Sequence, residues 1–123
     1  MNEEEEVLAF VHSELGSVWA LELLRLLRQN RDRSLTASEM VAGLRGSDLV
    51  VAQSVESLVA AGLIVVETDG AARYRPASAD LDKLSAEAEA LYAKSPDAVR
   101  RAIVAAANPG ISAFADAFRL RKD

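Results

Sequence analysis

Hydrophobic residues recur every three or four positions along most of the chain, and this is the spacing of a single helix face. Near the N-terminus, Val7, Val11 and Leu15 have this spacing and follow the glutamates of residues 3–6. Glutamates favour the first turn of a helix because they interact with the positive end of its dipole. The pattern therefore predicts an N-terminal helix over residues 1–16.

Residues 17–33 form a second and much more apolar helical pattern. Its polar positions Glu22, Arg25 and Gln29 make one narrow stripe, while valine, tryptophan and leucines cover almost all of the remaining surface. A helix with so little polar surface is buried on more than one side. We expect the domain's own core to cover one side, and the terminal helices or a second subunit to cover the other.

Two shorter helices are predicted next. Thr36 and Glu39 have the spacing of a capping box, which marks the start of the first of them. Ser47 can cap the second. The apolar face of this second helix is formed by residues separated by four, three and four positions, namely Val51, Val55, Leu58 and Gly62.

A β-hairpin is predicted after Gly62. Residues 63–66 are aliphatic, Asp69-Gly70 is a favoured turn pair, and Arg73 and Arg75 alternate along the second strand. Ser34-Leu35 is a candidate for a further, very short strand.

Helical spacing returns over residues 79–123. Ser95-Pro96 has the residue types of an N-cap and a first helical position, and Asn-Pro-Gly at residues 108–110 interrupts the pattern before a last apolar stretch. The predicted fold class is therefore mostly α with a small β-hairpin.

The composition allows one domain with a real core and helical appendages, since 50% of the 123 residues are hydrophobic. The net charge is −5, and the excess lies in residues 1–16, which carry five acidic groups and no basic one. Residues 17–78 balance seven arginines against seven acids. A typical nucleic-acid-binding domain carries a basic excess, which is absent here.

Several classes of function are disfavoured by the residues that are missing. The chain has no cysteine and a single histidine, His12, which argues against a metal site, and no nucleophile motif or phosphate-binding glycine loop is present. We therefore expect no enzymatic activity and no cofactor. The N-terminus lacks the features of a signal peptide and the longest apolar run is far too short to cross a bilayer, so we expect a cytoplasmic protein without membrane contact.

The order of these elements and the stretch "VESLVAAGLIVV" resemble the winged helix-turn-helix of bacterial transcription regulators of the MarR-like group. The matching residues are Val55, Leu58, Gly62, Leu63 and Ile64. The resemblance covers residues 17–78 and implies a winged helix-turn-helix domain between an N-terminal helix, residues 1–16, and C-terminal helices, residues 79–123.

Long flanking helices form the dimer in MarR-like proteins, so the resemblance implies a homodimer that presents two third helices to successive turns of DNA. The alternative is that these helices wrap the core of a single subunit. The apolar residues that are candidates for dimer contacts are Trp19, Leu84, Leu91, Ile103, Phe114 and Phe118.

The resemblance also implies candidate contacts to double-stranded DNA. On the third helix these are Ser47 toward phosphate, Val50 or Ala52 toward a thymine methyl group, and Gln53 toward an adenine edge, with Asp48 beside them. Outside that helix, the candidates for phosphate contacts are Arg45, Arg73 and Arg75, and with less weight Arg31 and Arg33.

The third helix nevertheless contains no lysine or arginine, and Asp48 and Glu56 would approach an anionic groove. Two hypotheses follow. The first is a homodimeric winged-helix transcription regulator. The second is a winged-helix adaptor whose third helix and wing bind a protein, for which a neutral surface with exposed Val50 and Ala52 is better suited.

Overall fold

The computed structural model describes residues 3–107, which are mostly helical with one two-stranded antiparallel sheet. The predicted fold class, mostly α with a small hairpin, is thereby confirmed. The elements in chain order are α1 (Glu3–Phe10), the π-helical turn η1 (Val11–Leu15), α2 (Val18–Gln29), α3 (Ala37–Leu44), α4 (Asp48–Ala60), β1 (Ile64–Val66), β2 (Ala72–Tyr74), α5 (Ala79–Lys94) and α6 (Pro96–Ala107).

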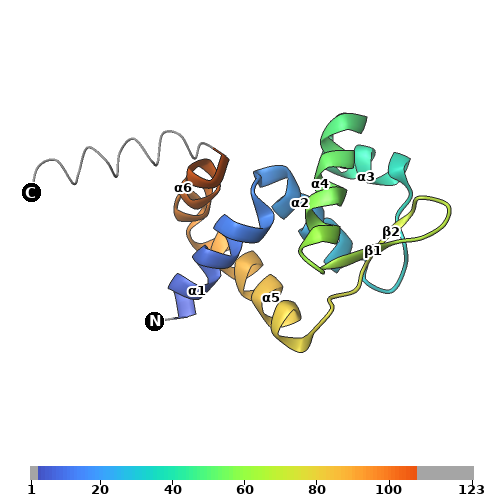
Figure 1. Cartoon of the computed structure of the whole chain (residues 1–123). Helices are drawn as coiled ribbons and strands as arrows, with labels where there is room; N and C mark the ends of the chain where they lie inside the picture. Colours follow the sequence, from blue (N-terminus) through green and yellow to red (C-terminus); the bar gives the residue numbers. More distant parts are fainter. Residues whose placement is uncertain (1–2, 108–123) are drawn as a thin grey trace, which may run out of the picture.

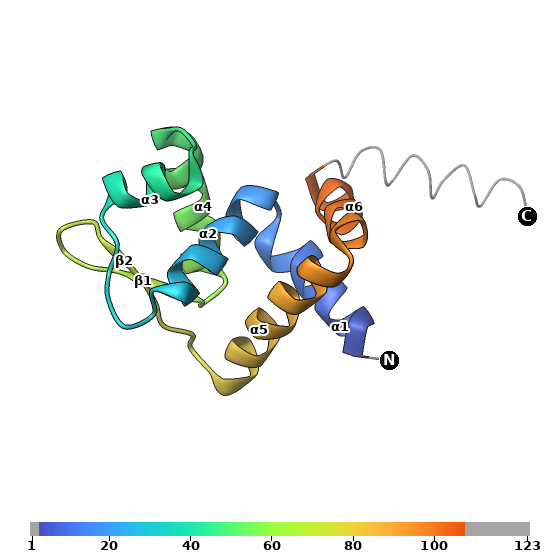
Figure 2. The ribbon, with the colours of Figure 1, turned by 180° about the vertical axis from the view of Figure 1, so that it is seen from behind.

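Helix α2 lies in the middle of the molecule, between two groups of elements. The terminal helices α1, α5 and α6 lie on one side of it, while α3, α4 and the hairpin lie on the other (Figures 1 and 2). Helix α2 contacts both groups, since it packs on α3, α4 and β2 and also on α5 and η1.

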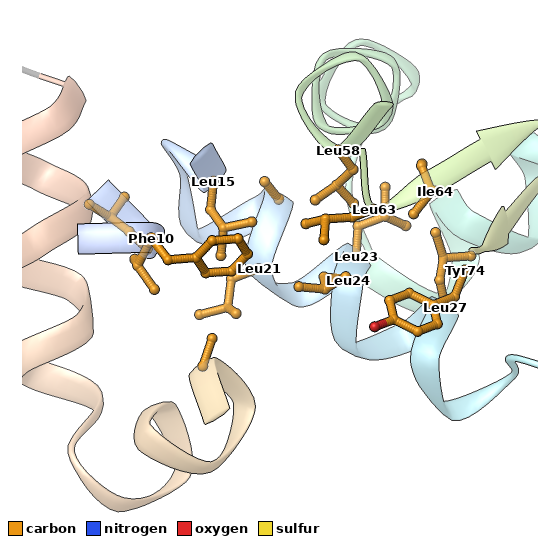
Figure 3. Close-up of a cluster of buried hydrophobic side chains, with 14 of the residues drawn as sticks. Phe10, Leu15, Leu21, Leu23, Leu24, Leu27, Leu58, Leu63, Ile64 and Tyr74 are labelled. Atoms are coloured by element: carbon orange, nitrogen blue, oxygen red, sulfur yellow. The ribbon is translucent and has the colours of Figure 1, made fainter. Parts of the chain in front are cut away.

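This central position explains the unusual hydrophobicity of α2. Leu21, Leu23, Leu24 and Leu27 are all completely buried within one chain. Figure 3 shows them between Phe10 and Leu15 on one side and residues of α4 and the hairpin on the other. The expectation that α2 is buried on more than one side is confirmed, and in this structure the cover comes from the chain's own helices.

The helices begin at the polar residues that the sequence places there. The hydroxyl oxygens of Ser17, Ser47 and Ser78 each accept a hydrogen bond from a backbone N–H in the first turn of α2, α4 and α5. Thr36 and Glu39 form the predicted capping box at the start of α3. The backbone N–H of Thr36 and the Arg33 guanidinium both bind the Glu39 carboxylate and hold its pKa below the ordinary value.

The hairpin is anchored to the rest of the fold through β2. Ile64 pairs with Tyr74, and Val65 pairs with Arg73. Leu35 adds a one-residue bridge on the other edge of β2, where Leu35 and Ala72 exchange two backbone hydrogen bonds of 2.8 Å. The short strand predicted at Ser34-Leu35 is therefore present as this bridge.

Within residues 3–107, no single helix combines the length and the apolar character needed to span a membrane.

We predict that Leu24→Ala will lower the free energy of unfolding by about 2–5 kcal/mol, because it opens a cavity at a completely buried position of the central helix α2. Urea denaturation followed by circular dichroism measures this change. The matched control is Leu49→Ala on α4, whose side chain is 66% exposed, and it should change stability by no more than about 0.5 kcal/mol. Equal effects of the two substitutions would contradict the burial described for α2.

Candidate nucleic-acid interface

One face of α4 is turned to solvent along its whole length. Val51, Ser54 and Leu58 are buried against the core, whereas the opposite stripe is exposed. The exposed stripe includes Leu49, Ala52, Gln53, Glu56, Val59 and Ala60. The structure thus presents two predicted base-contacting residues, Ala52 and Gln53, side by side on an accessible helix face.

Leu49 belongs to this face, although the sequence-based list of contacts omitted it. Its side chain is 66% exposed, which makes it the most exposed large hydrophobic residue among residues 3–107. Leu49, Ala52, Gln53 and Glu56 are separated by three, one and three positions, so helical spacing alone places Leu49 on the same face. The sequence therefore contained the information needed to include Leu49 in the exposed face of α4.

Val50 has a different environment from the one predicted for it. It is only partly exposed and lies beside Trp19 and Gly46, at the edge of a groove of about 260 Å³ between the start of α2 and α4. Gln53 lines the same groove. Trp19 itself is 41% exposed, so this edge of α4 offers an aromatic ring to a partner.

Ser47 and Asp48 are exposed at the N-terminus of α4. The Ser47 hydroxyl already accepts a hydrogen bond of 3.2 Å from the Val50 backbone N–H. It remains a possible donor, because a hydroxyl carries a proton as well as lone pairs. The partial positive charge of the helix N-terminus interacts favourably with the carboxylate of Asp48 and partly offsets its negative charge.

The arginines of residues 17–78 divide into two groups. Four of them have a carboxylate partner: Arg25 pairs with Glu22, Arg28 with Glu89, Arg31 with Asp82 and Arg33 with Glu39. The other three, Arg45, Arg73 and Arg75, are exposed and make no ion pair with any residue of the described chain. The two lesser candidates, Arg31 and Arg33, thus have structural partners, while the three principal candidates are free to bind an anion.

The three unpaired arginines lie at the end of α3, which packs on α4, and on or directly after β2, which pairs with the α4-packed strand β1. Arg45 ends α3, directly before α4, and has a left-handed backbone with φ of 55°. Arg73 and Arg75 alternate with buried Tyr74, so both side chains point to solvent from the outer face of the hairpin. The hairpin and α3 lie on the side of the molecule that faces away from α6 (Figures 1 and 2).

Tyr74 fixes the position of the strand that carries these arginines. The guanidinium groups of Arg28 and Arg31 both lie over its ring, 5.4 Å and 5.2 Å from the ring centroid. Its hydroxyl donates a hydrogen bond of 2.6 Å to Asp82 on α5. Burial and this bond to a carboxylate raise the pKa of Tyr74 above its ordinary value of 10.0.

The predicted dimer contacts have varied positions. Leu91 and Ile103 are buried in the chain's own core, and Leu84 is partly buried against it. Trp19 is exposed in the groove beside α4. Phe114 and Phe118 lie outside the described residues. Dimerisation remains a prediction.

Within residues 3–107, no group of three or more His, Asp or Glu side chains has an arrangement that could hold a metal ion. No protein-family model, curated protein or solved structure matches the chain.

We predict that protein stability will fall as the pH rises through the pKa of Tyr74. The folded state holds the phenol proton more tightly than the unfolded chain, so the stabilisation is complete below about pH 10 and is lost above it. Tyr74→Phe should remove this alkaline loss. At neutral pH it should lower stability by about 0.5–1.5 kcal/mol, because one hydrogen bond is lost while Asp82 keeps its ion pair with Arg31.

Urea unfolding measured between pH 8 and pH 11 tests both parts. Tyr92→Phe is the matched control, because Tyr92 is a partly buried tyrosine for which no hydrogen bond from the hydroxyl is found within the described chain. If wild type and Tyr74→Phe lose stability equally at alkaline pH, the role given to the Tyr74 hydroxyl is wrong.

Proposed function

We propose that this protein is a DNA-binding transcription regulator of the winged-helix type, similar to the MarR-like group, and that it acts as a homodimer. The order α2, α3, α4, β1, β2 supports this proposal, as does the bridge from Leu35 to the edge of β2, because helix-turn-helix domains with a wing are built in this order. Helix α4 would enter the major groove, and the hairpin would lie against the DNA backbone.

The observation that carries the proposal is the set of three unpaired arginines. Arg45, Arg73 and Arg75 are the only arginines of residues 17–78 without a carboxylate partner in the described chain. Arg45 lies in the turn before α4, and Arg73 and Arg75 lie in and directly after β2, the strand paired with the α4-packed strand β1. An exposed arginine without a partner retains its full attraction for a phosphate. Three such contacts would supply affinity that depends little on sequence.

The chemistry of α4 limits what it can read in the groove. The Gln53 amide can form two hydrogen bonds with an adenine, and the Ala52 methyl group can contact a thymine methyl group. No arginine or lysine lies on α4 to bind guanine, and Asp48 and Glu56 repel phosphates. We therefore expect moderate affinity and a preference for A·T pairs at the positions that α4 contacts.

A second candidate function is supported by the exposed apolar side chains of the same surface. Leu49 is 66% exposed and Trp19 is 41% exposed, and both flank the start of α4. Exposed tryptophan and leucine are typical of surfaces that bind proteins, where tryptophan contributes strongly to affinity. The alternative is an adaptor that binds a protein through α4 and the hairpin and does not bind DNA.

We predict that the affinity for duplex DNA will fall steeply as salt rises, and that the arginines will determine the slope. Each lost phosphate contact should reduce the slope of log K against log salt by about 1. The double variant Arg73→Ala, Arg75→Ala should therefore lower the slope by about 2 for each subunit that binds. Fluorescence anisotropy with labelled duplexes at several salt concentrations measures these slopes.

Arg100→Ala is the control for the loss of an arginine outside the proposed interface, and it is compared with Arg73→Ala alone. Arg100 is exposed on α6 and paired with Asp97, so its removal should leave the slope unchanged. Absence of binding to any duplex at low salt, with the wild-type chain folded, would refute the DNA-binding proposal.

We predict that Leu49→Lys will distinguish the two functions, because it adds a cation to the exposed face of α4 in its first turn. If α4 lies in a DNA groove, the variant should bind duplex DNA more tightly, with a salt slope larger by about 1 per subunit. If the face binds a protein through apolar contacts, the same variant should lose that partner in a pull-down. Ala42→Lys on exposed α3 is the control for the added charge alone.

A further inference from the structure

A groove of about 440 Å³ lies between α1 and α5, on the opposite side of α2 from the hairpin. Its apolar lining comes from Val7, Ala90 and Leu91. Glu3, Glu4 and Glu87 line it with negative charge, and Lys94 contributes one positive charge. The groove is therefore suited to an apolar segment that carries positive charge.

The negative charge of this groove is poorly compensated within the described chain. The carboxylates of Glu3 and Glu4 have no basic partner among residues 3–107, and Glu87 has only Lys83, at 3.8 Å, which is itself highly exposed. Partial burial and the adjacent carboxyl of Glu3 raise the pKa of Glu87, with Glu6 contributing further repulsion. A basic group bound here would relieve this repulsion.

The chain carries a segment with the complementary chemistry at its C-terminal end. Residues 118–122 are Phe-Arg-Leu-Arg-Lys, in which two apolar residues alternate with basic ones and a lysine follows. Phe118 and Leu120 are apolar, like the residues that line the floor of the groove. Arg119, Arg121 and Lys122 match its acidic lining in charge.

The length of the chain allows this segment to return to the groove. Helix α6 has 12 residues and starts at Pro96, two positions after Lys94, which lines the groove. At the helical rise its far end, Ala107, is about 18 Å from that start. The ten residues 108–117, which precede the segment, span about 15 Å at that same rise and about 33 Å when extended, so an extended connection covers the distance.

We propose that residues 118–122 of the same chain bind in the α1–α5 groove, with Phe118 and Leu120 on its apolar floor and the basic residues beside Glu3, Glu4 and Glu87. This contact joins the two ends of the chain on the face opposite the hairpin. It does not depend on DNA binding.

Disulfide trapping tests the proposal directly, because the natural chain contains no cysteine. The test variant carries Ala90→Cys and Leu120→Cys, and the control variant carries Ala42→Cys and Leu120→Cys, with Ala42 exposed on α3. Under mild oxidation, the groove pair should form an intrachain disulfide at least about tenfold faster than the control pair, since binding raises the local thiol concentration. In denaturing urea this preference should disappear.

The charge contribution is tested in the same assay. Glu87→Lys should slow trapping by roughly two- to fivefold, and Arg121→Glu added to Glu87→Lys should restore it. Glu56→Lys on α4 is the matched control and should have no effect. Salt near 1 M should reduce the preference of the groove pair, because it screens exposed charges within a few ångströms.

Equal rates for the two cysteine pairs, or a product that is mainly an interchain dimer, would overturn the proposal. A measurement without cysteines guards against misfolding of the trapping variants. In the full chain, Arg119→Glu with Arg121→Glu should increase amide hydrogen exchange around Val7 in α1 and leave exchange in α4 unchanged. Unchanged exchange in α1 would also overturn the proposal.

Discussion

The structure depends on the burial of α2 from two sides at once. Its leucines have no solvent-facing position to occupy, so the terminal helices and the α3–α4–hairpin group must both pack against it. Neither group has a large core without this helix. Removal of either group would expose several fully apolar side chains, each of which contributes about 1.5–3 kcal/mol when it is buried. The two halves of the molecule are therefore expected to fold together.

A polar cluster reinforces this junction at the base of the hairpin. Arg28 of α2 and Arg31, which follows α2, both lie over the Tyr74 ring, while Glu89 and Asp82 of α5 bind their guanidinium groups. A strand of the hairpin is thus connected to α5 through α2. The position of Arg73, next to Tyr74 in sequence, is consequently tied to the packing of the terminal helices.

Much of the fold could be predicted from local sequence, because periodicity and capping are local properties. Val51 and Leu58 have the expected buried positions, and Thr36 and Glu39 form the expected capping box. Partners that are distant in the chain could not be predicted. The pairing of Arg31 with Asp82 spans most of the domain in sequence, and no local pattern indicates it. The groove between α1 and α5 likewise follows from how two distant helices pack.

The candidate site was predicted in part. The exposure of Gln53, Arg73 and Arg75 agrees with the face that the spacing assigned to them. Val50 was placed on that face by position in the helix, but it is only partly exposed and lines the groove with Trp19, whereas Leu49 is fully on the exposed face. The difference arises because the start of α2 lies against the start of α4, and a helical pattern within α4 contains no information about this neighbour.

At Arg45 the backbone conformation favours one residue type, glycine, and the chain carries another. A left-handed conformation costs a residue with a side chain about 1 kcal/mol or more, and glycine would hold the same turn without that cost. The turn between α3 and α4 therefore contains a long cationic side chain that its geometry does not favour. The folding of this turn does not favour an arginine at this position, whereas the proposed phosphate contact would give its side chain a role.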